Sequence, residues 1–131
     1  MKLTRPLLCT AVFLVIACSN SNSPASDFRE GFWGGPNVGL SVEATHVTFL
    51  FDCAGGTVDG TIPVTDGRFD VTGTFTDGGN ARDVDHTPHP ARYTGRILGT
   101  HLTFTRILLD GSRPDASFAA DFGVAPQVAA C

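Results

Sequence analysis

The residues best suited to chemistry lie in one short stretch of the chain. Two carboxylates and two imidazoles fall within seven residues, contributed by Asp83, Asp85, His86 and His89. Carboxylate oxygens and imidazole nitrogens together bind hard and borderline divalent cations. The loop that contains this stretch, residues 78–90, has two prolines and offers no third anchored ligand, and exposed loops are rich in these residue types. We therefore expect no metal site. His86 and His89 are instead candidate contacts to a binding partner, and the alternative is a loop that is only solvated.

The remaining carboxylates give no catalytic pattern. Paired carboxylates can hydrolyse glycosides, but each of four aspartates precedes a glycine, the arrangement typical of turns: Asp59, Asp66, Asp77 and Asp110. The chain contains no Gly-x-Ser-x-Gly, HExxH, P-loop or GxGxxG motif. The sequence therefore predicts a protein that is not an enzyme and that uses no cofactor.

The amino terminus has the three-part pattern of a secretory signal. Lys2 and Arg5 precede an apolar run over residues 7–17, and serine and asparagine follow it. A membrane-spanning helix needs about 20 apolar residues, and this run is about half that length. Residues 1–17 are therefore predicted to be a signal peptide rather than a permanent anchor.

The end of the apolar run resembles a known processing site. Val15-Ile16-Ala17-Cys18 is similar to the bacterial lipobox, in which a small residue precedes a cysteine that is acylated before cleavage. The resemblance implies a lipoprotein with palmitate-type chains on Cys18, tethered by residues 18–27 to the outside of the cytoplasmic membrane. Ser19 implies the outer membrane where the host has one. The alternative is ordinary cleavage nearby, with Cys18 as a plain thiol.

Two cysteines remain after this processing. Cys9 would leave with the signal peptide and Cys18 would carry lipid, so Cys53 and Cys131 are the pair available in an oxidising compartment. We expect a disulfide between them, which stabilises the fold by about 4 kcal/mol in the chain-entropy model. The alternative is a free thiol at Cys53, although no neighbouring histidine or CxxC partner would activate it.

Residues 28–131 are predicted to be one all-β domain. Apolar and polar residues alternate in short runs separated by turn residues, and no 3.6-residue period is sustained. Turns are expected at 54–56 and at Asp66-Gly67, and the longest loop at 78–90. The expected strands cover residues 32–34, 38–42, 47–53, 57–65, 68–76, 92–97, 101–109 and 116–124.

Seven or eight short strands favour an antiparallel meander. An open meander would leave two long unpaired edges, and neither end strand has the lysine or proline that usually protects an edge. We therefore expect a closed or nearly closed small barrel, with a β-sandwich as the alternative.

The start of the domain resembles a family of barrels. Gly31-Phe32-Trp33 looks like the Gly-x-Trp at the start of calycins, which include lipocalins, streptavidin-type proteins and small bacterial metalloprotease inhibitors. The resemblance implies that Trp33 closes one end of the barrel beneath an arginine from a late strand, for which Arg106 is the candidate; the alternative is that Arg106 reaches water at a strand end. The whole chain also resembles small bacterial lipoproteins of unassigned function.

Charge narrows the possible partners. Without Lys2 and Arg5, seven arginines face thirteen acidic residues, a net charge of −6, which excludes a nucleic-acid-binding role. We expect a lipid-anchored, non-enzymatic binding or scaffold module whose loops contact a protein, with protease inhibition as one form of this. The alternative is a carrier of a small apolar ligand in a lumen lined by Phe49, Phe51, Phe69, Phe75 and Phe104.

Overall fold

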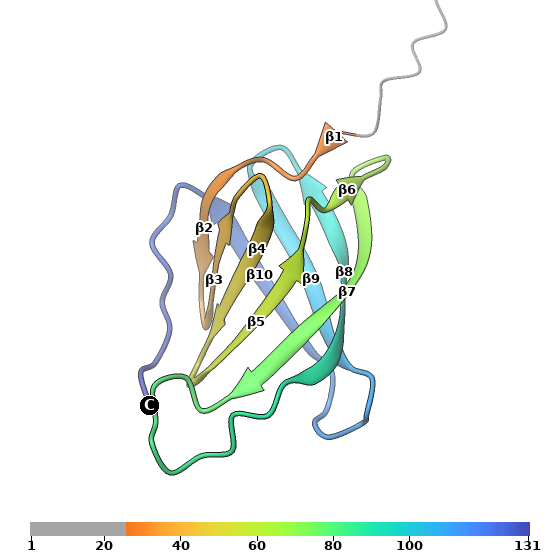
Figure 1. Ribbon diagram of the computed structural model, residues 1–131. Helices are drawn as coiled ribbons and strands as arrows, with labels where there is room; N and C mark the ends of the chain where they lie inside the picture. Colours follow the sequence, from red (N-terminus) through yellow and green to blue (C-terminus); the bar gives the residue numbers. More distant parts are fainter. Residues whose placement is uncertain (1–25) are drawn as a thin grey trace, which may run out of the picture.

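The computed structural model of the protein describes residues 26–131 (Figure 1). The predicted signal peptide, Cys18 and the first part of the tether lie outside these residues. Within the described part, no helix is found that could cross a membrane. The chain there forms β1 (Ser26–Asp27), β2 (Gly31–Gly35), β3 (Val38–Val42), β4 (His46–Phe51), β5 (Ala54–Asp59), β6 (Pro63–Val64), β7 (Arg68–Asp77), β8 (His89–Leu98), β9 (His101–Leu108) and β10 (Ala116–Phe122).

Eight of these strands form a closed antiparallel barrel, as predicted. Its order is β10-β2-β3-β4-β5-β7-β8-β9. Neighbouring strands in the barrel are successive along the chain, apart from the closing pair and from β5 and β7, between which β6 lies outside the barrel. The closing pair is β10 with β2, where Asp121 lies opposite Gly34 and Phe122 opposite Trp33. Closure removes the two unpaired edges that an open meander would leave.

Several strand boundaries differ from the predicted ones. The expected turn at 54–56 is the first half of β5, because Gly55 and Gly56 pair with β7 and let its backbone approach closely. The expected strand at 57–65 is interrupted after Asp59. The chain leaves the barrel there, and its continuation, β6, pairs with β1 in a separate two-stranded sheet. That pairing includes Ser26 and Asp27, which the sequence assigned to the tether. The Asp66-Gly67 turn is confirmed, with φ angles of 52° and 72°.

Aromatic side chains fill the barrel. Phe49 stacks on Tyr93 with ring centroids 4.1 Å apart, and the rings of Phe51 and Phe104 pack next to them. The Tyr93 hydroxyl donates to Thr74 O at 2.7 Å. Gly56 leaves room for this hydroxyl, because a Cβ at position 56 would lie only 2.1 Å from the Tyr93 oxygen. Burial raises the pKa of this phenol. The interior of the barrel is therefore a packed core.

The C-terminal segment runs along the outside of the barrel (Figure 1, blue). Residues 124–131, which we call the strap, lie on β2 and β3 where glycines leave room. A Cβ on Gly34 would meet Val124 O at 2.2 Å, and one on Gly39 would meet the Pro126 side chain at 2.5 Å. Gly34 and Gly39 thus leave room for the strap, whereas a Cβ on Gly35 would meet Ala119 O of β10 at 2.1 Å; the strand pattern alone did not reveal either reason.

Candidate functional site

One end of the barrel carries the long connections. β7 and β9 both end there, at Asp77 and Leu108, and the loops that follow them cover residues 78–88 and 109–115. The 52–53 turn and the end of the strap reach the same end. We call these four segments the distal rim, because β1, where the described chain begins, lies at the opposite end (Figure 1).

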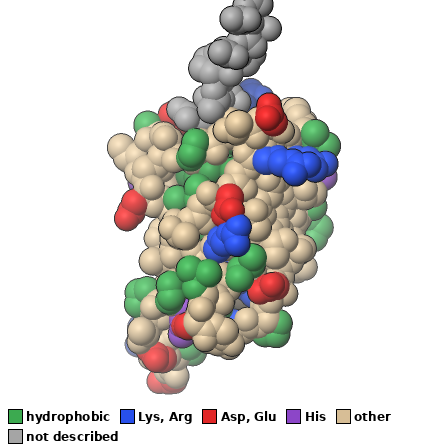
Figure 2. All heavy atoms as spheres, turned by 90° about the vertical axis from the view of Figure 1, so that its right-hand side faces the viewer, with side chains coloured by type: hydrophobic (Ala, Val, Ile, Leu, Met, Phe, Trp, Pro, Cys, Tyr) green, Lys and Arg blue, Asp and Glu red, His purple; other side chains and the backbone are tan. Residues whose placement is uncertain are grey.

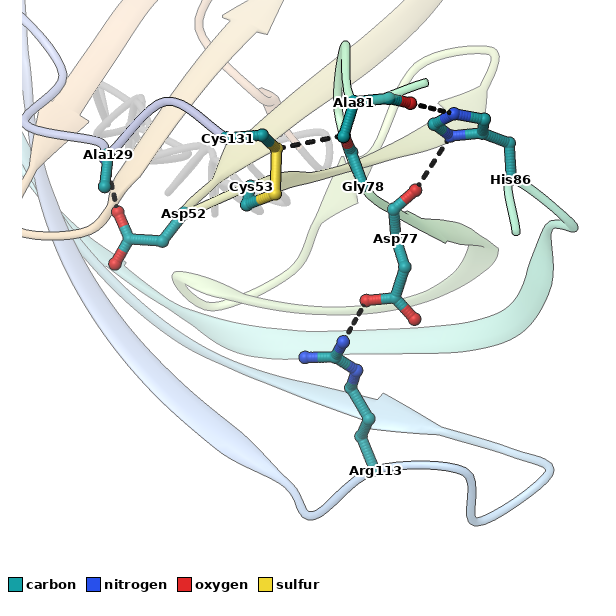
Figure 3. Close-up of a disulfide and its surroundings, with 9 residues drawn as sticks. All are labelled: Asp52, Cys53, Asp77, Gly78, Ala81, His86, Arg113, Ala129 and Cys131. Atoms are coloured by element: carbon teal, nitrogen blue, oxygen red, sulfur yellow. Dashed lines mark hydrogen bonds and ion pairs between the residues drawn. A yellow bond between two sulfur atoms is a disulfide. The ribbon is translucent and has the colours of Figure 1, made fainter. Parts of the chain in front are cut away.

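A disulfide fixes the strap to the rim, as predicted. Cys53 and Cys131 are bonded across 78 residues of sequence, with their Cα atoms 4.7 Å apart (Figure 3). Next to the bond, Ala129 N donates to the Asp52 carboxylate at 2.6 Å, and Cys53 N donates to Ala129 O at 3.1 Å. Cys131 Sγ lies 2.9 Å from Gly78 O. A disulfide sulfur has no proton to donate, so this is a packing contact against the first residue of the 78–88 loop.

His86 holds the 78–88 loop in shape. Its Nδ1 lies 3.0 Å from Asp77 O and its Nε2 lies 2.6 Å from Ala81 O, as Figure 3 shows. Both partners are carbonyl oxygens, which only accept, so the imidazolium form alone makes both hydrogen bonds. The sequence suggested that His86 contacts a partner. In the structure its ring nitrogens contact the loop's own backbone and the residue is exposed, so contact with a partner stays a prediction.

His89 is in β8 rather than in the predicted loop, because β8 starts one residue before Pro90. Its Nδ1 lies 2.6 Å from the Asp110 carboxylate, which connects the first residue of β8 to the 109–115 loop. Ser112 N also donates to Asp110, at 3.0 Å. The hydrogen bonds from Ser112 and His89 lower the pKa of Asp110 to about 2. From the sequence we identified Asp110 only as a turn residue. Its contact with His89 could not be predicted, because the two residues are 21 positions apart in the chain.

This Asp-His-Ser group is not a catalytic triad. In a triad the aspartate binds one imidazole nitrogen and the serine the other. Here Ser112 Oγ lies 3.4 Å from His89 Nδ1, the same nitrogen that faces Asp110. The serine therefore has no base positioned to take its proton. Residues 26–131 also hold no group of three His, Cys, Asp or Glu side chains that could bind a metal ion.

A second ionic link joins the two rim loops. Arg113 forms an ion pair with Asp77, at the end of β7 (Figure 3). The contact lacks hydrogen-bond geometry, and the buried Asp77 Oδ1 accepts no hydrogen bond within the described chain. The 109–115 loop is therefore connected to β7 through the Arg113–Asp77 ion pair and to β8 through the Asp110–His89 contact. These are the two strands that flank the 78–88 loop.

Arg106 closes the barrel beneath the rim, but not as the calycin resemblance implied. The side chain points inward and is only 8% exposed, and its guanidinium lies 4.5 Å from the Phe75 ring centroid. Nη2 donates to Pro114 O at 3.4 Å, whereas Nε has no hydrogen-bond partner among residues 26–131. Burial lowers the pKa of Arg106, and the nearby positive charge of Arg113 acts in the same direction.

Trp33 lies at the other end of the barrel from Arg106. The register sets them apart, because Trp33 pairs with Phe122 at the end of β10 and Arg106 pairs with Ala116 at its start. Trp33 is 1% exposed, packs edge-to-face on Phe28 and Phe122, and donates from Nε1 to Arg29 O at 3.2 Å. The predicted stacking of Arg106 on Trp33 is therefore wrong. An early arginine, Arg29, covers this end instead, 3.8 Å from the Phe122 centroid.

No protein family, curated protein or solved structure matches this chain.

Proposed function

We propose that the protein is a lipid-anchored, extracytoplasmic binding module whose distal rim contacts a protein partner. The single observation that supports this best is the rim itself. Each residue from 82 to 88 is exposed, yet the base of the 78–88 loop is held by the disulfide and by the contacts of the His86 ring nitrogens with two backbone carbonyls. A loop whose shape is set before binding loses less conformational entropy when a partner binds.

The position of the rim supports the same proposal. If Cys18 carries lipid, the tether joins the domain at β1, and the rim lies at the end that faces away from the membrane (Figure 1). The domain would then present the rim to proteins in solution or on an opposing surface, at the far end of a barrel whose longest strands, of 10 residues, span roughly 33 Å.

The packed core argues against the carrier alternative. Phe49, Phe51, Phe69, Phe75 and Phe104, the proposed ligand-lining residues, are each at most 4% exposed, and they contact one another or other core aromatics. A lumen filled by side chains leaves no room for a ligand of useful size. Retention of a small molecule by the folded domain in native mass spectrometry would favour the carrier function instead.

Affinity capture with a matched pair of variants tests the rim. The rim variant carries Arg82→Ser and Asp83→Ser, at two exposed positions whose side chains make no hydrogen bond or ion pair within the described chain. The control carries Thr72→Ser and Thr103→Ser, which are exposed on the barrel wall. From detergent-solubilised envelopes we expect the wild type and the control to capture the same protein and the rim variant to lose it. A partner that stays bound to the rim variant would refute the proposed site.

A further inference from the structure

Two arginines stand directly opposite each other on the outer wall. Arg68 of β7 is the register partner of Arg96 of β8, and both side chains are exposed. Like charges placed directly opposite across two strands repel each other. Figure 2 faces this side of the barrel and shows basic side chains gathered near its upper end, beside the end of the domain that carries β1.

Apart from Arg82 in the exposed 78–88 loop, the other arginines among residues 26–131 each have a partner on the protein. Arg92 binds the Asp70 carboxylate through two nitrogens, and this hydrogen bonding lowers the pKa of Asp70. Arg113 pairs with Asp77, and Arg29 and Arg106 lie over aromatic rings. Among residues 26–131, Arg68 and Arg96 form no ion pair with a carboxylate, and the nearest acidic group on their wall, Asp70, is already neutralised by Arg92.

The pair also lines a groove. An open hollow of about 660 Å³ lies between β6 and the β7-β8 wall, and Arg68 and Arg96 form one side of it. Thr65 lines the same hollow, and its hydroxyl can donate to an oxygen ligand. The Asp70 carboxylate also lines the hollow, but it is bound by Arg92. The two guanidinium forks of Arg68 and Arg96 match a tetrahedral oxyanion with several acceptor oxygens.

We propose that Arg68 and Arg96 together bind a phosphate-type oxyanion, and that its source is the headgroup of an anionic phospholipid. β6 pairs with β1, so the groove adjoins the end of the domain where the tether joins it. The headgroup assignment rests on the proposed lipid anchor, which would hold this end next to the bilayer. The oxyanion site itself does not depend on the anchor. Because the domain is acidic overall, binding must come from this local pair and not from general attraction.

The first test uses residues 19–131, which contain the whole barrel and its disulfide, and inorganic phosphate as the probe. We expect the side-chain Nε–H resonances of Arg68 and Arg96 to shift together on titration, while that of Arg82, at the opposite end, does not. Equal shifts at all three arginines, or none, would overturn the oxyanion site.

The second test identifies the source of the phosphate. Flotation with vesicles of phosphatidylcholine containing 30% phosphatidylglycerol is compared with flotation on pure phosphatidylcholine. We expect binding to the anionic vesicles alone, lowered about fivefold by Arg68→Gln and by Arg96→Gln, since a basic residue near an anionic surface contributes about 1 kcal/mol. The control Arg82→Gln makes the same charge change and should bind like the wild type.

The outcomes separate the parts of the proposal. Resonance shifts with phosphate but no vesicle binding would overturn the headgroup assignment and leave free phosphate as the ligand. An equal loss in Arg82→Gln would overturn the paired site in favour of net charge. Fatty-acid labelling of the full chain, with and without Cys18→Ser, tests the anchor independently, so that its failure is distinguishable from failure of the groove.

Discussion

Removing the Cys53–Cys131 bond should cost the domain a large part of its stability. The perturbation is the double variant Cys53→Ser and Cys131→Ser, which leaves no free thiol at either position. The bond closes a loop of 78 residues. The chain-entropy relation then gives about 4.5 kcal/mol at 25 °C, against a total free energy of unfolding of about 5–15 kcal/mol for a typical domain.

Urea unfolding of residues 19–131 without reductant measures this loss. We expect the free energy of unfolding to fall by about 4 kcal/mol and the melting temperature by roughly 15–20 °C. The m-value should rise, because the unfolded chain without the cross-link exposes more surface. Asp52→Ala in the oxidised protein is the matched control. It removes the hydrogen bond to Ala129 N but keeps the bond, and it should cost about 1–2 kcal/mol.

A loss below about 1 kcal/mol in the double variant would refute this reasoning. It would mean that the strap remains in place without the bond and that the unfolded chain is already as compact as the cross-linked one. A loss equal to that of Asp52→Ala would show that the bond acts only through local strap contacts.

Three further predictions concern the core and the rim. Arg106→Met should leave the free energy of unfolding unchanged or raise it, because burial of the guanidinium with an unpartnered Nε is unfavourable. A fall of more than about 1 kcal/mol in urea unfolding would show that the contacts of the guanidinium with aromatic rings outweigh the cost of burying it. Tyr93→Phe should cost about 1–2 kcal/mol in the same assay, by leaving Thr74 O without its donor, and an unchanged midpoint would contradict this. The lowered pKa of Asp110, about 2, adds stability that is fully present above its ordinary pKa near 4 and is lost as pH falls through 2. Unfolding midpoints between pH 4 and pH 2 should therefore decline less steeply in Asp110→Asn than in the wild type, and equal slopes would argue against the His89 and Ser112 contacts.

The fold was predictable because each strand has its own local pattern. Val47, Phe49 and Phe51 alternate with exposed residues, and the structure buries all three. Closure was also predictable, from the absence of protected edges. The break after Asp59 was not, because nothing in the residues 57–65 shows that β1 is the partner of β6. Pairing with a strand far away in sequence is a tertiary effect.

The site was less predictable than the fold. The alternation of residues along β9 predicted that the Arg106 side chain points into the barrel, and the structure confirms it. The alternation could not predict which aromatic rings Arg106 contacts, because that depends on how the other strands are placed along the barrel. The contacts of His86 and His89 show the same limit, since the carbonyls and the carboxylate they bind belong to backbone and loops whose positions no local pattern determines.

The two ends of the barrel differ in how their charged side chains are paired. At the β1 end, the opposed Arg68 and Arg96 form no ion pair with a carboxylate of the described residues. At the rim, by contrast, several charged groups bind one another or the backbone: Asp110 binds His89, Asp77 pairs with Arg113, and His86 contacts backbone carbonyls. A rim that uses its charges to fix its own shape leaves recognition to the exposed residues 82–85. Affinity for a partner should therefore depend on loop rigidity as much as on contact residues, and His86→Ala, which removes the contacts of this ring with the loop carbonyls, should weaken binding.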